Sequence, residues 1–373
     1  MAETSLPPSP IRAQISLAAW RHNLARLQSA APNSKLLAVI KANAYGHGAI
    51  EAARTLEGAA AFGVARLGEG VELRAAGIRK PIVLMEGVFS DAELTVALQH
   101  ELDLVVHERY QIEMLERVTE VRHRPVIWLK LDTGMSRLGF QEGQAAEAAT
   151  RLRALPLQSE LRVMTHFACA DEPGLPMTSE QMTRFDGQLE TLVSASADRA
   201  DPIVAGLANS AAILRSPSTH RDWVRAGIAL YGSSPFADQD AAALGLKPVM
   251  TLTSRVIALR ELKAGETVGY GATWRAARPS RIATIAAGYA DGVPRHLRSG
   301  SPVLIAGHRV SLVGRVSMDM ITVDVTDVPG VTIGTEAVLW GEGLSVDEVA
   351  KAAGTIAYEL LCGVTRRVTF EYR

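Results

Sequence analysis

Short apolar runs alternate with Ala- and Leu-rich amphipathic stretches along the first two thirds of the chain. Eight of these runs predict buried strands: Leu36–Lys41, Ala60–Ala65, Pro81–Met85, Leu102–Val106, Pro125–Leu131, Leu161–Phe167, Pro202–Ala208 and Trp223–Leu230. The stretches between most of them predict helices: Ile50–Leu56, Gly68–Ala76, Asp91–Gln99, Glu108–Val118, Gln144–Leu152 and Glu180–Ala195. Strands that alternate with helices pair in parallel, and eight such units fit an α/β fold of the closed (β/α)8 type.

An open, doubly wound parallel sheet fits the same pattern, and periodicity alone does not exclude it. Such sheets commonly bind dinucleotides through a G-x-G-x-x-G turn after the first strand. No turn of this kind follows Leu36–Lys41. Its lack counts against a dinucleotide-binding fold.

The pattern changes after Pro235. One helical segment, Ser345–Ala353, interrupts a series of strand-like runs: Met250–Leu259, Arg281–Ala287, Pro302–Ile305, Val310–Val313, Ile321–Val325, Glu336–Leu339 and Val368–Tyr372. Gly-rich turns separate some of these runs, which predicts a second, mainly antiparallel β domain. We therefore expect a barrel over residues 11–240 and a β domain over residues 241–373.

Composition restricts the classes of partner. The chain has 373 residues, 47% of them hydrophobic, and 39 basic against 40 acidic residues give a net charge of −1. This balance leaves no electrostatic footprint for nucleic acid or an anionic membrane. Two cysteines, Cys169 and Cys362, make neither a disulfide scaffold nor a four-thiolate zinc site, and we expect no metal. The first residues carry no signal-peptide pattern, so we expect a cytoplasmic protein.

A lysine stands at the C-terminal end of the first predicted strand, in the segment Val39–Gly48. Barrels and open α/β sheets place their active sites at this end of their strands. A buried amine has a depressed pKa or a covalent partner, as in Schiff-base chemistry. Position alone favours the alternative, a Lys41 that extends into solvent.

The last two predicted strands end in residues suited to an anion. Ser210 follows Gly206 and opens the helical turn Ala211–Leu214, where it could cap the helix and face a phosphate. Gly227 would let backbone amides approach the same group. An ordinary helix cap and a tight turn are the alternatives. Together with Lys41, however, phosphate-type residues at strands seven and eight suggest pyridoxal phosphate (PLP).

Arg225 and His166 lie in apolar strand contexts. An arginine at the pyridine nitrogen of PLP would keep that nitrogen unprotonated and weaken the ring as an electron sink. This would favour a simple proton transfer over transamination. The alternatives are a structural ion pair for Arg225 and a satisfied core histidine for His166.

Two loops add further candidates. Arg137 lies just past the fifth strand in a glycine-bracketed loop, where it could face a carboxylate. Lys130 alternates with apolar residues before it, and a salt bridge with Asp132 is the alternative to a buried or modified amine. Tyr270 lies between two glycines and could donate or accept a proton. Turn chemistry is the alternative for Tyr270 and for the loops 288–292 and 314–320.

Several segments of the chain, in the order in which they occur, resemble those of the alanine racemase family, whose members are PLP-dependent enzymes with a (β/α)8 barrel and a C-terminal β domain. The resemblance covers essentially the whole chain. The segments that carry it are Val39–Gly46, Lys130–Gly139, His166–Ala168, Asn209–Ser210, Arg225–Gly232, Tyr270–Gly271, Gly288–Gly292, Gly314–Asp319 and Tyr358–Glu359.

The resemblance implies a role for each matching residue. Lys41 would bind PLP as a Schiff base, with Arg225 at the pyridine nitrogen, positioned by His166. Arg137 would lie near the phenolic oxygen and the substrate carboxylate, to which Met318 would offer its backbone amide. The remaining cofactor-binding residues, most of them at the phosphate, would be Tyr45, Asn209, Ser210, Gly227, Ile228 and Tyr358.

The implied reaction interconverts L- and D-alanine, for cell-wall peptidoglycan or for alanine catabolism. Lys41 would take the Cα proton of D-alanine and Tyr270 that of L-alanine, on opposite faces. The family is a homodimer in which one subunit's β domain completes the other's site, so Tyr270 and Met318 would act in trans. Residues 1–10 would pack with the β domain. Some members carry the residue at Lys130 as a carbamate, and many have cysteine where Ser317 stands here.

Three alternatives remain open. A broad-spectrum or serine racemase would need a roomier pocket, and many such enzymes are exported. A PLP-dependent decarboxylase of related fold would place an acid where Arg225 stands. A non-catalytic PLP-binding protein built on the barrel alone would lack the domain that carries Tyr270 and Met318.

Overall fold

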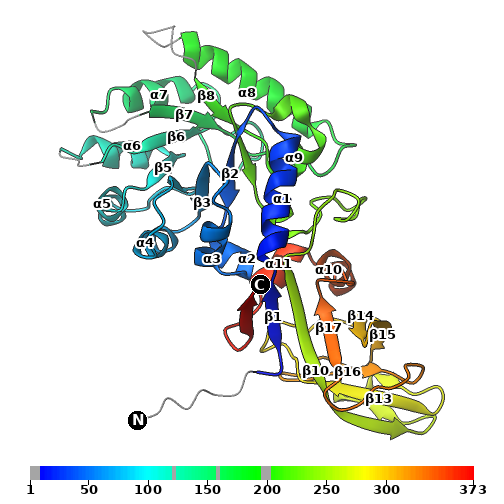
Figure 1. Ribbon diagram of the computed structural model, residues 1–373. Coiled ribbons are helices and arrows are strands. Elements are labelled where there is room, and N and C mark those ends of the chain that lie inside the picture. The colour runs from blue at the N-terminus through cyan, green and yellow to red at the C-terminus, as the bar shows by residue number, and fades with distance from the viewer. Residues whose placement is uncertain (1–8, 120–122, 157–159, 195–202) are drawn as a thin grey trace, which may run out of the picture.

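Eight parallel strands close into a barrel in chain order, which confirms the predicted (β/α)8 architecture (Figure 1). The computed structural model describes residues 9–119, 123–156, 160–194 and 203–373. The barrel strands are β2 (Lys35–Val39), β3 (Ala61–Val64), β4 (Ile82–Leu84), β5 (Asp103–Val106), β6 (Val126–Lys130), β7 (Glu160–Met164), β8 (Val204–Gly206) and β9 (Trp223–Ala226). Strands buried on both faces read as continuous apolar runs, which is why the sequence located all eight.

Helices cover the outside of the barrel and alternate with its strands. They are α1 (Leu17–Ala30), α3 (Ala49–Thr55), α4 (Leu67–Ala75), α5 (Asp91–Gln99), α6 (Arg109–Glu116), α7 (Ala145–Arg153), α8 (Met177–Ser194) and α9 (Ser210–Arg215). The short segment α2 (Lys41–Gly46) follows β2 and is mostly left-handed. Short 3-10 turns are η1 (Pro217–Thr219) and η2 (Ile228–Tyr231). Ala195 and Pro202, at the ends of a predicted helix and strand, lie outside the described residues.

Helix α1 was missing from the predicted elements. Its start is fixed by Ser16, whose side chain accepts a hydrogen bond from the backbone of Ala19. Trp20, Leu24 and Leu27 follow at helical spacing and are all buried.

The β domain is built on one eight-stranded sheet, in the order β13-β16-β15-β14-β17-β10-β1-β18. Its strands are β1 (Arg12–Ile15), β10 (Met250–Leu262), β13 (Ser280–Ile285), β14 (Pro302–Ile305), β15 (His308–Leu312), β16 (Ile321–Asp324), β17 (Glu336–Trp340) and β18 (Thr369–Tyr372). A two-stranded ribbon, β11 (Thr267–Val268) and β12 (Trp274–Arg275), holds the 3-10 turn η3 (Tyr270–Ala272). All pairs of the large sheet are antiparallel except β1 with β18.

Strand β1 corrects one expected boundary. We assign residues 11–240 to the barrel from the sequence, but Arg12–Ile15 pairs with β10 and β18 in the β-domain sheet. The sequence of a four-residue strand does not indicate which strands it pairs with, because alternating burial occurs in any strand with one buried face. Residues 1–8, the larger part of the expected N-terminal segment, lie outside the described residues.

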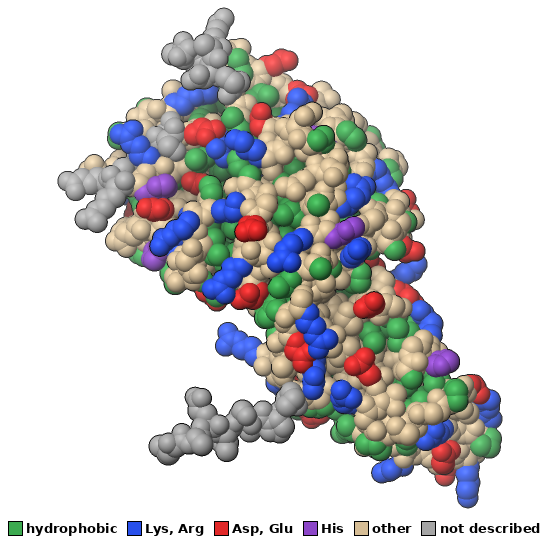
Figure 2. All heavy atoms as spheres, viewed as in Figure 1, with side chains coloured by type: hydrophobic (Ala, Val, Ile, Leu, Met, Phe, Trp, Pro, Cys, Tyr) green, Lys and Arg blue, Asp and Glu red, His purple; other side chains and the backbone are tan. Residues whose placement is uncertain are grey.

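Two further helices, α10 (Val346–Ala353) and α11 (Ala357–Cys362), lie where the barrel meets the β domain (Figure 1). Helix α11 packs on α2, close enough that a Cβ on Gly46 would overlap the carbonyl oxygen of Leu361. On the face shown in Figure 2, acidic and basic side chains are interspersed over both parts of the molecule. Among the described residues, no helix has the length and apolar character needed to cross a membrane.

Candidate active site

Lys41 opens a left-handed turn at the C-terminal end of β2. The next four residues have left-handed backbone angles, with φ between +52° and +54°: Ala42, Asn43, Ala44 and Tyr45. For a residue with a Cβ this conformation costs roughly 1–2 kcal/mol. Backbone strain of this size persists only where the surroundings impose it, and it occurs preferentially at functional sites.

Hydrogen bonds from both ends hold the turn. The Ala44 amide donates to the Ile40 carbonyl (2.8 Å). The Nδ1 atom of His47 lies 3.1 Å from the Ala44 oxygen and 2.8 Å from the Tyr45 oxygen. Burial lowers the pKa of His47 to about 4, so the ring is neutral and Nδ1–H donates to these carbonyls.

Aromatic packing sets the direction of the Tyr45 side chain. Its ring stacks on Tyr231 at a centroid distance of 4.5 Å, and the ring of Tyr358 lies 5.7 Å away. The Tyr231 hydroxyl donates to the carbonyl of Val39 (2.8 Å), which connects this stack to the last residue of β2, just before Lys41. Burial raises the pKa of Tyr45, so its hydroxyl stays protonated and available as a donor.

The Tyr45 hydroxyl meets the ends of β8 and β9. A Cβ on Gly227 would lie 2.9 Å from the Tyr45 hydroxyl oxygen and 3.8 Å from Ser210 Oγ, so a larger residue at this position would crowd the Tyr45 hydroxyl. Ser210 Oγ accepts from the amides of Gly227 (2.9 Å) and Ala229 (3.3 Å). Hydroxyls and backbone amides therefore come together at this point, and these are the kinds of group that hold a phosphate.

One detail of this group of residues differs from the prediction. Asn209, not Ser210, caps helix α9, because its side chain accepts from the amide of Ala212 (3.1 Å). Ser210 is the first helical residue instead. Its hydroxyl is thereby directed to the β9–η2 turn, where Ile228 begins η2.

Arg225 lies on β9 and is 3% exposed. It forms no ion pair with an acid among the described residues, so the alternative of a structural ion pair is wrong there. Its guanidinium donates to the backbone carbonyls of Gly206 (2.5 Å), Thr165 (2.5 Å) and Leu207 (2.9 Å). It also lies 3.4 Å from Nδ1 of His166. Burial and then the charge of Arg225 lower the pKa of His166 to about 3, so this ring is neutral and Nδ1 accepts.

Lys130 ends β6, 9% exposed, within a group of cations. Burial lowers its pKa to about 8, with further lowering by Arg225, Arg137 and Lys41. The salt bridge with Asp132 does not form in the described structure. One oxygen of Asp132 accepts instead from the backbone amides of Gly134 and Ser136, each at 3.0 Å, and shapes the loop that presents Arg137.

A buried glutamine that the sequence did not single out supports this side of the site. Gln181 on α8 accepts from the amide of Ala168 (2.9 Å) through Oε1. Its amide nitrogen donates to the His166 carbonyl (3.0 Å) and to Thr133 Oγ1 (3.1 Å). These bonds join the loops after β6 and β7. Only the polar residue on a buried helix face could have indicated this role.

Three loops of the β domain meet on one face. The amides of Tyr289 and Ala290 donate to the carbonyls of Ser317 and Met318, each at 3.0 Å. A Cβ on Gly271, next to Tyr270, would lie 3.2 Å from the Arg315 guanidinium. Tyr270 is 69% exposed and Met318 is 52% exposed. Ser317 contributes its backbone to this contact.

The structure thus gathers the candidates into two groups. One group, at the barrel mouth, contains Lys41, the residues expected to bind the phosphate, and Lys130, His166 and Arg225. The other contains Tyr270 and Met318. In the part of the chain that the structure describes, no hydrogen bond or ion pair joins Tyr270 or Met318 to the first group.

Comparisons with known proteins agree with this arrangement. A family model for the N-terminal domain of alanine racemase matches residues 15–235, and one for the C-terminal domain matches residues 249–372. A biosynthetic alanine racemase from Pseudomonas aeruginosa is 48% identical over 365 residues, 97% of this chain and 99% of that protein. An alanine racemase from Hahella chejuensis is 46% identical over 371 residues, with 97% and 98% covered.

Solved structures give the same result. The crystal structure of the Pseudomonas aeruginosa biosynthetic enzyme superposes with a TM-score of 0.92, at 48% identity, over 98% of this chain and 99% of that one. Alanine racemase from Acinetobacter baumannii gives a TM-score of 0.89 at 41% identity, with 97% and 99% covered. With two family models over both domains and relatives matched along nearly their whole length, this chain belongs to the alanine racemase family.

Proposed function

We propose that this protein is a PLP-dependent racemase that interconverts L-alanine and D-alanine. The observation that carries the proposal is the buried Arg225, whose partners are backbone carbonyls and a neutral His166 in place of an acid. An arginine beside the pyridine nitrogen leaves that nitrogen unprotonated, which favours reversible proton transfer over reactions that need a strong electron sink.

The residues at the barrel mouth fit PLP. Lys41 would hold the cofactor covalently, and the phosphate would bind beside Gly227, Ser210 and the Tyr45 hydroxyl, which lie so close together that a Cβ at residue 227 would crowd the hydroxyl. Ile228, Asn209 and Tyr358 complete the set. When bound, PLP withdraws electrons from Cα of an amino acid and makes the Cα proton acidic.

The two proton carriers are Lys41 and Tyr270. Lys41 Nζ takes or returns the Cα proton on the side of D-alanine, and the Tyr270 hydroxyl does so on the side of L-alanine. Two carriers on opposite faces allow either enantiomer to leave. Each must reach to about 3 Å from the proton it moves.

Tyr270 needs a second copy of the chain to do this. At 69% exposure it is open to water, whereas general acids and bases act in sites from which bulk water is excluded. We therefore propose a homodimer in which Tyr270 and Met318 of one protomer complete the barrel site of its partner. Within the described residues the Met318 amide donates no backbone hydrogen bond, which suits binding of a substrate carboxylate.

Lys130 is a candidate for carbamate formation. Its neighbours Arg225, Arg137 and Lys41 are cationic, and a pKa of about 8 leaves part of its amine neutral near physiological pH. The neutral amine would add to CO2 and release a proton, and the resulting anion would pair with Arg137. Arg137 would then be held for the substrate carboxylate.

A racemisation assay tests the proposal. Purified protein supplied with PLP is given L-alanine, L-serine or L-arginine in separate reactions, and the D-enantiomers are measured. Fast conversion of alanine alone supports the proposal. Equal rates on all three substrates point to a broad-spectrum racemase. A yellow protein that racemises none of them points to a PLP-binding or lyase role. The product would supply peptidoglycan or, in the reverse direction, alanine catabolism, in the cytoplasm.

A further inference from the structure

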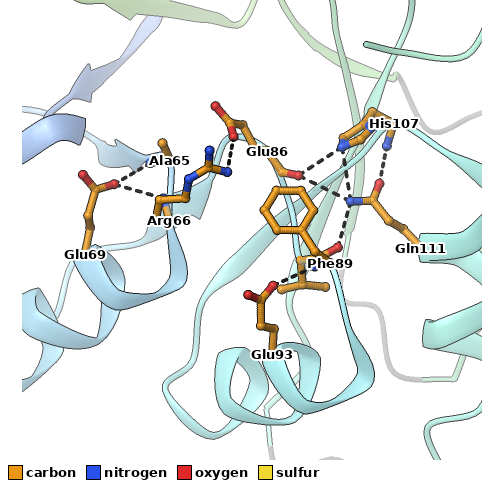
Figure 3. Close-up of polar contacts among 9 residues, drawn as sticks. Ala65, Arg66, Glu69, Glu86, Phe89, Glu93, His107 and Gln111 are labelled. Carbon is orange, nitrogen blue, oxygen red and sulfur yellow. Dashed lines mark hydrogen bonds and ion pairs between the residues drawn. The ribbon is translucent and has the colours of Figure 1, made fainter.

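Glu69 bridges the loop that follows Lys41 and the loop that follows the next barrel strand. One carboxylate oxygen accepts from the amide of Ala42 at 2.6 Å. The other accepts from the amides of Ala65 (2.8 Å) and Arg66 (3.0 Å), as Figure 3 shows. Glu69 lies in the first turn of α4, which places its negative charge at the favourable end of that helix.

The bond to Ala42 acts directly on the lysine. The Ala42 amide belongs to the same peptide group as the Lys41 carbonyl, so fixing this amide fixes the peptide plane that follows the lysine Cα. Ala42 is also the first of the four left-handed residues. A charged acceptor forms stronger hydrogen bonds than a neutral one and so opposes relaxation of the turn.

The loop after β3, to which Glu69 is hydrogen-bonded, has further contacts of its own. Arg66 pairs with the Glu86 carboxylate at 2.6 Å and stacks over the ring of Phe89 at 5.4 Å. The backbone oxygen of Glu86 lies 3.1 Å from Nε2 of His107 (Figure 3). These contacts connect the loops that follow β5, β4 and β3 to the end of β2. The position of the Ala42 amide therefore depends on loops from four barrel strands.

We propose that Glu69 is a positioning residue for Lys41. It keeps the left-handed turn in place and thereby aims the amine at the proton it moves. The role rests on the proposed racemase function. It requires a carboxylate, because both side-chain oxygens accept hydrogen bonds, whereas a glutamine has one acceptor and would turn its NH2 group towards an amide donor.

The test uses Glu69→Gln and Glu69→Asp in the PLP-loaded enzyme, with Glu72→Gln on the exposed face of α4 as control. The aspartate variant keeps the charge at the start of α4, so helix stability is retained while the bridge is shortened. Amide hydrogen exchange of the peptide containing Ala42, kcat, KM and thermal unfolding are measured for each. The exchange measurement needs no turnover and is independent of the substrate.

Both variants should exchange the Ala42 amide faster. Their kcat should fall on the order of tenfold to hundredfold with little change in KM, as expected for a misaimed proton carrier. Glu72→Gln should match the wild type in all four measurements. An unchanged kcat in a variant whose Ala42 amide exchanges faster would overturn the positioning role. So would a loss of kcat that is the same in both variants and is accompanied by the same loss of melting temperature. A wild type that racemises no amino acid would instead refute the proposed function and leave the exchange result to report on the bridge.

Discussion

Ala42 and Ala44 share a left-handed backbone but differ in burial, which allows the strain of the lysine turn to be measured. Ala42 is exposed and Ala44 is fully buried. Glycine adopts positive φ without the Cβ clash. Replacing Ala42 by glycine removes about 1–2 kcal/mol of strain and adds roughly 0.4–1 kcal/mol of unfolded-state entropy. The difference lies between about 0 and 1.6 kcal/mol, so we expect Ala42→Gly to raise the free energy of unfolding by about 0.8 kcal/mol.

Two further variants make the comparison specific. Ala44→Gly gains the same relief but loses a buried methyl group worth about 0.8 kcal/mol plus a small cavity, so its net effect should be near zero or unfavourable. Ala25 lies on the exposed face of the right-handed helix α1. The Ala25→Gly variant should lower the free energy of unfolding by about 1 kcal/mol.

Urea unfolding of the three variants, followed by fluorescence, checks the order of their stabilities. A decrease for Ala42→Gly equal to that for Ala25→Gly would refute the reasoning, because the lysine turn would then behave as ordinary right-handed helix. The kcat of Ala42→Gly should also fall, since the turn that aims Lys41 becomes softer as it becomes less strained.

Other predictions concern the cofactor, the proton carriers and pH. Lys41→Ala should abolish both activity and the yellow absorbance, and a yellow, active variant would refute the assignment. Tyr270→Phe should keep the colour while turnover falls roughly 10²–10⁴-fold; fast exchange of alanine in both directions would contradict the two-carrier scheme. Gly227→Ala brings a methyl group within 2.9 Å of the Tyr45 hydroxyl, so equilibrium titration should show weaker PLP binding. Because the pKa of His47 falls from 6.5 unfolded to about 4 folded, its contribution is complete above pH 6.5 and lost as pH falls toward 4, on the order of 3 kcal/mol. Urea midpoints between pH 7.5 and 4.5 should show this loss in the wild type and less of it in His47→Gln.

The sequence predicted the parts of the fold that repeat a simple pattern. All eight barrel strands were found because most residues of these buried parallel strands are apolar. The left-handed turn was not predicted, because Ala, Asn, Ala and Tyr carry no signal for four successive positive φ values. It depends on contacts from distant segments, among them Tyr231 and Glu69.

The residues of the candidate site were likewise predicted only in part. Lys41, Arg225 and Ser210 could be placed because strand ends locate the chemistry of a barrel. Supporting residues such as Gln181 escaped notice, since their partners lie in other loops and come together only in the folded chain. The helix cap is Asn209 and not Ser210, which shows that the capping residue among neighbouring polar residues cannot be chosen without the path of the backbone.

The placement of β1 between β10 and β18 has a consequence for folding. Arg12 pairs with Thr253 on one side and with Thr369 on the other, so β1 is synthesised well before either of the strands that it pairs with. Until then β1 is an unpaired edge that other strands can capture. Contacts so distant along the chain form slowly, which makes closure of this sheet a candidate for the late, rate-limiting step of folding. A fragment covering residues 241–373 alone would leave β18 without the neighbour that joins it to the sheet.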